Sequence, residues 1–417
     1  MKTIVKVHTL SNGMRAVFAP REAESAAVGV FIGSGSRHET PATAGISHFI
    51  EHMLFKGTPT RSHADISRAV EGRGGTCNAG TGEEHTCYYM HLPSEYLADA
   101  CDILSDMYYN ASIPADEFDR EKMVVIEEIK MYDDDPSSVA AENLQRAVFP
   151  KSQLGSPVAG SPESLAPMRP ADLKRYIKTH YLPSNTVVSV SGCFDESEAL
   201  AAVERFFGRR RTRTGKVSAD RGDAGRPVAG VKVERVINQT QIALGYRAFG
   251  FEDPRRHAAA VMNAVLGRGM SSRLFMGVRE KLGLCYDIYS ELRQYRGAGL
   301  FSVSAGTSPE KAAKTLSAIE KELRRMREKN VPAAELKRVK DYLSGMFRLG
   351  LENVRSRMFY FANSLLAFGR IETPEEQIDG VMSVTAADVK SVAEAVFRPL
   401  NRSLSLVVPK KSEKKGK

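Results

Sequence analysis

The sequence has no tryptophan and only five cysteines in 417 residues. The cysteines are odd in number, scattered, and form no Cys-x-x-Cys pair. We therefore expect neither a disulfide framework nor a cysteine-rich metal site. Free thiols of this kind are typical of a reducing compartment, which predicts a cytoplasmic protein.

Signals for membranes and nucleotides are missing as well. No apolar run approaches the roughly 18 residues that a membrane-spanning helix needs. Residues 1–8 alternate like a strand and lack the apolar segment of a signal peptide. The glycine-rich stretch 72–82 lacks the Gly-Lys-Ser/Thr ending of a phosphate-binding loop. We therefore expect neither membrane insertion nor nucleotide binding.

The formal net charge is +9, but the basic residues gather in two stretches of low complexity. Five lysines lie in the tail 410–417, and an arginine cluster at 209–213 lies in a Gly/Arg/Asp-rich stretch, 208–227, typical of a linker. No aromatic residues alternate with these charges, and no nucleic-acid-binding motif is present. We expect a disordered tail and no nucleic-acid partner.

The sequence does contain a His-x-x-Glu-His motif at His48, Glu51 and His52. If residues 44–55 form a helix, the two histidines lie one turn apart on one face, and both imidazoles can reach one metal ion. Glu51 then lies beside that ion, where a carboxylate can take a proton from bound water. The motif is the reverse spelling of the His-Glu-x-x-His pattern of zinc peptidases.

A third ligand is available in the segment 120–130. Glu121 and Glu128 are seven residues apart and so share one face of a helix. The residues between them are largely apolar, and a carboxylate on such a helix is unfavourable unless it is paired or binds a metal. The segment therefore offers Glu128 as a candidate third ligand, although a helix with solvated glutamates would have the same pattern.

Together, the two motifs resemble the inverzincin zinc peptidases, the family of pitrilysin, insulin-degrading enzyme and mitochondrial processing peptidase. The resemblance implies one zinc ion per chain, held by His48, His52 and Glu128. It also implies that Glu51 is the general base that acts on zinc-bound water. Glu121 is then a carboxylate that supports the ligands from outside the coordination sphere.

Two further segments resemble substrate-binding parts of that family. The polar, glycine-rich segment 74–89 resembles an edge strand on which Asn78, Ala79 and Thr81 contact the peptide backbone. Such an edge can accept an extended peptide as an added strand. The segment 267–286 resembles the part in which Arg279 and Tyr286 bind the substrate backbone and stabilise the tetrahedral intermediate.

The two halves of the chain look like copies of one domain. Residues 113–117 match 331–335 at an offset of 218, and residues 172–185 match 388–401 at an offset of 216. The second half has no His-x-x-Glu-His motif, so the metal site belongs to one copy only.

We expect an α+β fold with two tandem homologous domains, each a mostly antiparallel six-stranded sheet covered by helices. The predicted boundaries are a zinc-binding catalytic domain at 1–207, a linker at 208–227, a degenerate copy at 228–409 and the tail at 410–417.

The function that follows from the resemblance is that of a zinc metalloendopeptidase, which hydrolyses extended peptides or unfolded polypeptides. Two alternatives stay open: a processing peptidase that cleaves protein precursors at specific sites, and a non-catalytic scaffold subunit, as some relatives in respiratory complexes are. Scaffold relatives lose metal ligands, whereas this chain keeps all of them. Members of that family place the zinc domain of one half against the second domain of another half. Because one chain here carries both the zinc motif and the pair Arg279 and Tyr286, the resemblance implies a homodimer with shared active sites.

Overall fold

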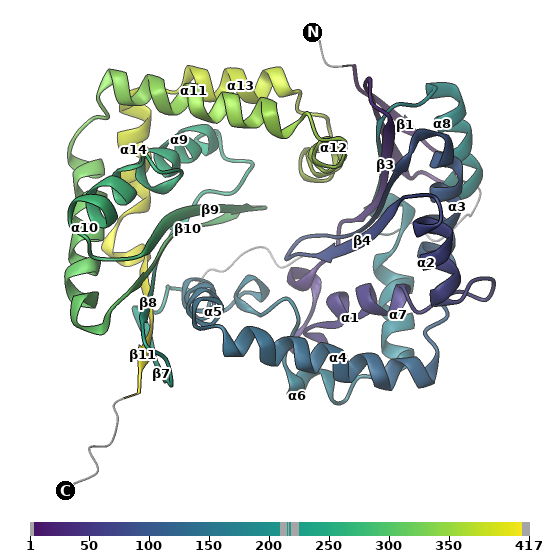
Figure 1. Ribbon diagram of the computed structural model, residues 1–417, viewed down its shortest axis with the longest axis horizontal. Helices are drawn as coiled ribbons and strands as arrows, with labels where there is room; N and C mark the ends of the chain where they lie inside the picture. Colours follow the sequence, from purple (N-terminus) through teal and green to yellow (C-terminus); the bar gives the residue numbers. More distant parts are fainter. Residues whose placement is uncertain (1–3, 209–214, 216, 218–224, 411–417) are drawn as a thin grey trace, which may run out of the picture. The chain divides into compact units, whose positions relative to one another are not determined.

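The computed structural model of the chain describes residues 4–208, 215, 217 and 225–410 (Figure 1). Most of the predicted linker, and residues 411–417 of the predicted tail, lie outside the described residues. The chain forms two compact units. Unit 1 draws on residues 1–129, 157–220 and 347–374, and unit 2 on residues 130–156, 221–346 and 375–417. Each unit is built around one sheet with helices against it, which confirms the α+β class.

Six strands form the sheet of unit 1: β1 (Lys6–Thr9), β2 (Arg15–Pro20), β3 (Ser25–Ile32), β4 (Thr76–Thr81), β5 (Thr86–Pro93) and β6 (Thr186–Gly192). Their order is β1-β2-β6-β3-β5-β4, and all neighbours are antiparallel except β2 and β6. A turn at Asn12 and Gly13 joins β1 to β2. Gly13 has a φ of +86°, a conformation that glycine adopts without strain.

Five strands form the sheet of unit 2: β7 (Gly230–Arg235), β8 (Thr240–Ala248), β9 (Asp287–Tyr295), β10 (Ala298–Thr307) and β11 (Arg402–Pro409). Their order is β7-β11-β8-β10-β9, and only β7 and β11 are parallel. This repeats the arrangement β2-β6-β3-β5-β4 of unit 1, as a duplicated domain predicts.

The second sheet has five strands rather than the six expected, because no counterpart of β1 is present among the described residues. In unit 1 that strand is held by the turn at Asn12 and Gly13. The described residues directly before β7, 225–229, contain no such turn signal and include Pro227, which has no N–H to donate to a strand ladder.

Fourteen α-helices complete the described part of the chain: α1 (Ile46–Leu54), α2 (His63–Glu71), α3 (Leu97–Asn110), α4 (Ala115–Asp134), α5 (Pro136–Val148), α6 (Pro162–Leu165), α7 (Pro170–His180), α8 (Glu196–Val203), α9 (Arg256–Gly267), α10 (Ala312–Glu328), α11 (Ala333–Gly350), α12 (Val354–Phe368), α13 (Pro374–Ser383) and α14 (Ala386–Val396). None of these helices combines the length and the apolar character needed to cross a bilayer.

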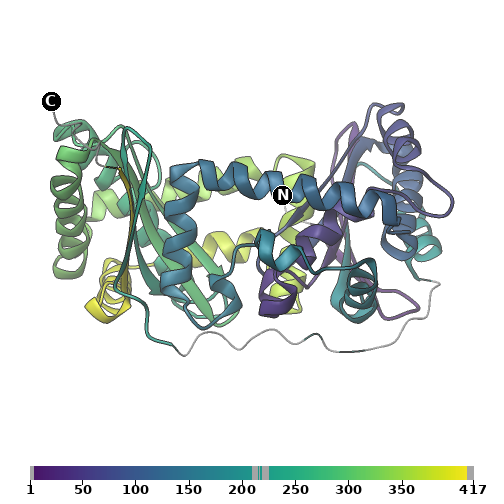
Figure 2. The ribbon, with the colours of Figure 1, turned by 90° about the horizontal axis from the view of Figure 1, so that it is seen from below.

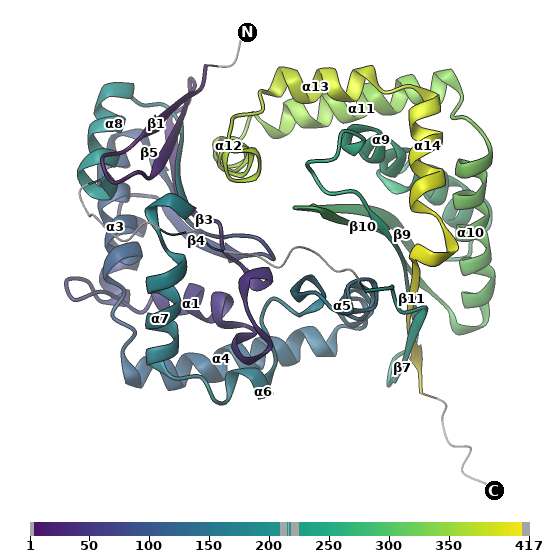
Figure 3. The ribbon, with the colours of Figure 1, turned by 180° about the vertical axis from the view of Figure 1, so that it is seen from behind.

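Two helices are exchanged between the halves of the sequence. α12 lies in the second half but packs on the sheet of unit 1 (Figure 1). α5 lies in the first half but packs on the sheet of unit 2 (Figure 2). Figure 3 shows α9, α10 and α14 on the other face of that second sheet. The compact units therefore do not follow the contiguous ranges 1–207 and 228–409.

A glycine in each sheet allows α12 or α5 to pack closely against the backbone of the sheet. A β-carbon added at Gly29 in β3 would lie 3.1 Å from the sulfur of Met358 in α12, and one at Gly245 in β8 would lie 2.9 Å from the side chain of Leu144 in α5. Met358 and Leu144 are both buried at these contacts. The missing side chain is thus a packing requirement where each helix crosses its sheet.

The face of the first sheet opposite α12 carries the site. There α1, α3, α7 and α8 pack against β-strand side chains to form the main core of unit 1. α1 lies against β4 and β5, at one edge of the sheet. The fold therefore brings the candidate metal helix beside the glycine-rich edge strand.

Candidate metal centre

Buried hydrogen bonds fix the start of α1, the helix that carries two candidate ligands. Gly45 precedes the helix with a φ of +91°. The carboxylate of Glu39 accepts hydrogen bonds from the backbone N–H groups of Gly45 and Ser47, both at 2.8 Å. Burial raises the pKa of Glu39 to about 7, and the two hydrogen bonds oppose that shift. These contacts hold the first turn of α1 in place, and with it His48.

The three candidate ligands converge. Nε2 of His48 lies 3.7 Å, and Nε2 of His52 3.4 Å, from Oε2 of Glu128 in α4. Ligand atoms of all three residues lie within 4.8 Å of one another. Burial and the neighbouring His52 lower the pKa of His48 to about 4. Its imidazole is therefore neutral at physiological pH, which is the form that binds a metal.

A carboxylate and a lysine lie behind His52. Oε1 of Glu121 is 2.8 Å from Nδ1 of His52, and Oε2 of Glu121 is 2.5 Å from Nζ of Lys56. Although burial opposes ionisation, the hydrogen bonds from Lys56 and His52 lower the pKa of Glu121. An ionised carboxylate can only accept, so Nδ1 of His52 carries the proton and Nε2 presents its lone pair to the cluster.

Glu51 is held by the edge strand. Its Oε2 accepts a hydrogen bond of 2.5 Å from the hydroxyl of Thr81. Burial raises the pKa of Glu51, and the bond from Thr81 opposes the shift. The side chain of Thr81 therefore contacts the candidate base, and the predicted contact of its main chain with the substrate backbone stays a prediction. A carboxyl group with a raised pKa is suited to proton transfer near neutral pH.

β4 lies at the edge of its sheet, and within the described chain no strand pairs with its outer side. The pairing with β5 places Asn78 beside Tyr89 and Ala79 beside Tyr88. Because Tyr88 packs in the core with α1 and Tyr89 packs against α12, Ala79 and Thr81 lie on the α1 face. Asn78 lies on the α12 face and is exposed. The three predicted substrate-binding residues thus share one accessible edge.

Arg279 and Tyr286 lie together in unit 2. The Arg279 guanidinium lies over the ring of Phe275, at 4.4 Å from its centroid, and 5.7 Å from the centroid of Tyr286. Tyr286 is 80% exposed, so its hydroxyl is accessible to a ligand. Since these residues belong to unit 2 and the metal cluster to unit 1, their role in the reaction stays a prediction.

The sequence analysis missed Lys56 and Glu39. Lys56 follows His52 by four residues, a spacing that already brings a cation near the second histidine. Glu39 lies in a turn-rich loop without periodicity, and only the fold shows that it binds the start of α1.

The residues present fit a zinc ion. Two imidazole nitrogens and one carboxylate oxygen form the His₂Glu set of catalytic zinc sites, which keep a fourth position open. The donation from His52 to Glu121 is the carboxylate–histidine contact that commonly orients zinc ligands. Nδ1 of His48 is buried without a hydrogen-bond partner. Nε2 is therefore the ring nitrogen through which His48 would bind a metal.

Comparisons with known proteins agree with this geometry. Residues 16–162 match the family described as Insulinase (Peptidase family M16), and residues 167–343 match the family described as Peptidase M16 inactive domain. The first range contains the cluster of His48, His52 and Glu128, and the second contains Arg279 and Tyr286.

The chain is 34% identical over 407 residues to the uncharacterized zinc protease YmxG of Bacillus subtilis (strain 168), covering 97% of this chain and 98% of that protein. It is 38% identical over 390 residues to the uncharacterized zinc protease Rv2782c of Mycobacterium tuberculosis (strain ATCC 25618 / H37Rv), covering 92% and 89%. A solved protease from Helicobacter pylori shares the fold, with a TM-score of 0.94 and 21% identity over 98% of this chain and 100% of that chain. The chain therefore belongs to peptidase family M16, which confirms the predicted family.

Proposed function

We propose that this protein is a zinc-dependent metalloendopeptidase that hydrolyses extended peptides or unfolded polypeptides. The observation that carries the proposal is the convergence of His48, His52 and Glu128 within 4.8 Å, with Glu51 next to His52 in the same helix. The relatives named zinc proteases support the same class of activity.

Each residue of the site has a role in this reaction. Zinc held by the three ligands supplies a Lewis acid that makes water acidic near neutral pH. Glu51 accepts a proton from the attacking water and delivers it to the leaving amine. Thr81 orients the Glu51 carboxylate through its hydroxyl. Glu121 keeps the proton of His52 on Nδ1, away from the metal-binding nitrogen.

The open edge of β4 provides the means of holding the substrate. An extended peptide that adds to this edge binds through main-chain hydrogen bonds, which are independent of its sequence. Asn78, Ala79 and Thr81 lie along that edge. We assign Arg279 and Tyr286 to the substrate backbone and to the negative charge that develops on the carbonyl oxygen.

We further propose that the working unit is a cytoplasmic homodimer with one zinc ion per chain and with active sites shared between the chains. One chain carries both the metal ligands and the pair Arg279 and Tyr286, so no different partner chain is needed. A two-fold dimer then has two identical sites.

The test combines metal content with peptide cleavage. The purified protein should contain about one zinc per chain and cleave an unstructured peptide, and a chelator should abolish cleavage. Glu51→Gln should abolish cleavage and retain zinc, whereas Glu71→Gln, at the exposed end of α2, should change neither. Zinc lost in Glu51→Gln but retained in Glu128→Gln would refute the assigned roles.

The same assay separates the two alternatives. A chain that cleaves neither unstructured peptides nor protein precursors would support a scaffold subunit. Cleavage at one site of a protein precursor, with unstructured peptides left intact, would support a processing peptidase.

A further inference from the structure

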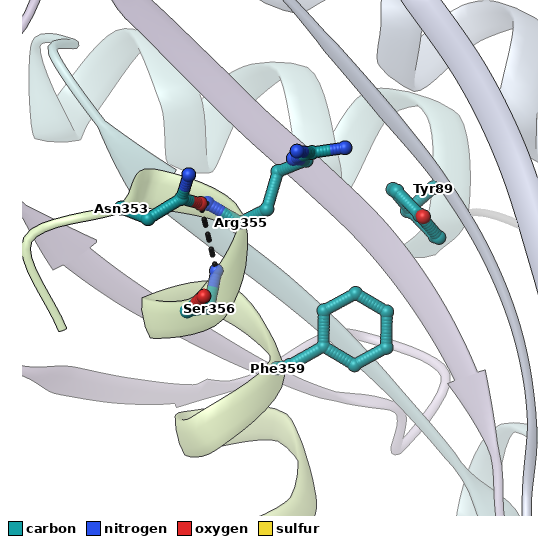
Figure 4. A pocket seen from close by; sticks show the side chains of 5 residues that line it. All are labelled: Tyr89, Asn353, Arg355, Ser356 and Phe359. Carbon is teal, nitrogen blue, oxygen red and sulfur yellow. Dashed lines mark hydrogen bonds between the residues drawn. The ribbon is translucent and has the colours of Figure 1, made fainter. Parts of the chain in front are cut away.

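A pocket lies on the α12 face of the first sheet, away from the metal cluster. Its volume is about 400 Å³, and its lining residues are Tyr89, Asn353, Arg355, Ser356 and Phe359. Tyr89 comes from β5 and the other four come from the start of α12. Figure 4 shows Arg355 and Phe359 extending from the helix toward the side on which Tyr89 lies. All five residues belong to unit 1.

The register of the sheet links this pocket to the substrate edge. Tyr89 pairs with Asn78 of β4, so both side chains lie on the α12 face. Side chains of a strand alternate between its two faces. In a peptide added to β4, every second side chain therefore lies on the pocket face, and the residues between them lie on the face of α1.

The pocket is lined by two aromatic rings and by one positively charged side chain, Arg355. The rings of Tyr89 and Phe359 pack edge to face, with centroids 5.1 Å apart. Asn353 uses its carboxamide oxygen to cap α12, accepting from the N–H groups of Arg355 and Ser356. Within the described ranges no carboxylate pairs with the Arg355 guanidinium, and the residue is exposed.

The charge of Arg355 lies close enough to the sheet to act on a residue of β5. Burial, followed by the positive charge of Arg355, lowers the pKa of His91, which lies two residues from Tyr89 on the same face of β5. His91 also contacts the hydroxyl of Ser25 through Nε2 at 2.8 Å. The cation is thus close to the row of side chains that a bound peptide would continue.

We propose that this pocket is a specificity subsite for an acidic side chain of a peptide bound along β4, with Arg355 as the charge partner. The proposal rests on the proposed peptidase function. Tyr89 and Phe359 exclude water from one side of the pocket, which strengthens an ion pair formed there. Only the peptide side chain on the α12 face that lies nearest Arg355 would enter the pocket, so the preference depends on position as well as on charge.

The test uses a set of otherwise neutral peptides in which a single glutamate is moved one position at a time, with cleavage sites mapped by mass spectrometry. Glutamate at one position should lower KM about two- to fivefold relative to glutamine, as an ion pair with an exposed arginine does. The two adjacent positions should have no effect, because their side chains lie on the α1 face.

Variants of Arg355 identify the partner. Arg355→Gln should remove the advantage of glutamate, and Arg355→Glu should transfer it to lysine at the same position. Arg175→Gln, a change of another exposed arginine in the same unit, should leave the preference intact. A KM that does not depend on glutamate position, or a preference that survives Arg355→Gln, would overturn the proposal.

A binding measurement distinguishes failure of the subsite from failure of the peptidase function. Glu51→Gln protein should bind a fluorescent peptide with glutamate at the preferred position about two- to fivefold more tightly than Glu51→Gln/Arg355→Gln protein. Equal dissociation constants overturn the subsite, whether or not the unmodified protein cleaves peptides. Absence of all cleavage together with an Arg355-dependent affinity would instead refute only the peptidase function.

Discussion

His52 and Glu121 are joined by a hydrogen bond of 2.8 Å in which Nδ1 of the imidazole is the donor. Lys56 binds the other oxygen of the same carboxylate. Hydrogen bonds thus link His52, Glu121 and Lys56 in series. They set the ring orientation and the proton position of His52, which is one of the candidate metal ligands. Such outer contacts raise metal affinity by pre-orienting the ligand.

Lys56→Met should therefore weaken zinc binding about tenfold. Without the ammonium group, Glu121 loses one of the two hydrogen bonds that keep it ionised and in place. The measurement is the zinc dissociation constant by competition with a chelating dye. Lys337→Met, which removes an exposed ion pair with Asp341, is the control and should have no effect. An unchanged zinc affinity in Lys56→Met would contradict the role of this residue.

Glu121 and Glu128 should differ in the size of their effects. Glu128→Gln removes a ligand and should reduce zinc occupancy to a small fraction. Glu121→Gln keeps all ligands and should weaken affinity roughly ten- to a hundredfold. Both are measured as zinc content after dialysis against graded chelator. Equal losses from the two variants would contradict the distinction between ligand and supporting carboxylate.

Gly29→Ala and Gly245→Ala should each destabilise the protein by roughly 1–3 kcal/mol, because the added methyl group presses on Phe31 and Met358 in the first case and on Leu144 in the second. Gly345→Ala in α11 is the matched control. A β-carbon there meets nothing within 4 Å, and alanine should stabilise the helix by about 0.5–1 kcal/mol. Urea unfolding of zinc-free protein measures all three. A neutral effect at both sheet glycines would count against close packing of the exchanged helices.

The local features of the site could be predicted from the sequence, since they depend on short-range periodicity. The four-residue spacing of His48 and His52 is a helix property, and Glu128 stood out as a carboxylate on a largely apolar helix. The repeated offset near 218 predicted the duplicated sheet order, because strand and helix starts carry local signals such as proline.

The exchange of α5 and α12 could not be predicted in this way. The amphipathic pattern of a helix shows which of its faces is buried, but not which sheet covers that face. The pocket was missed for the same reason. Tyr89 and Phe359 are in contact only because α12, from the second half of the sequence, packs on the sheet of unit 1. Lys56 is different, since its spacing from His52 was visible in the sequence.

Glu39 should make stability depend on pH. Burial raises its folded pKa to about 7 from a usual value of 4.5. Its contribution is therefore fully present below pH 4.5 and is lost as the pH rises through 7. The shift corresponds to about 3 kcal/mol between those limits. Urea unfolding of zinc-free wild-type and Glu39→Gln protein should show the wild type losing stability relative to the variant over this window. A constant difference between the two would contradict the raised pKa.

Shared active sites predict that two inactive proteins restore activity when mixed. Glu51→Gln carries its lesion in unit 1, and Arg279→Ala carries its lesion in unit 2. If a site combines the metal cluster of one chain with Arg279 of the other, the mixed dimer has one site with both lesions and one site with neither. Random exchange of subunits makes about half of the dimers mixed, so peptidase activity should return to roughly a quarter of the wild-type value.

A third protein shows whether this recovery has the proposed cause. The double variant Glu51→Gln/Arg279→Ala, mixed with Arg279→Ala, forms dimers in which every shared site lacks Arg279, so no activity should return. If each site is instead built within one chain, every site in the first mixture also carries a lesion and that mixture stays inactive. An active enzyme that sediments strictly as a monomer would rule out shared sites before any mixing is done.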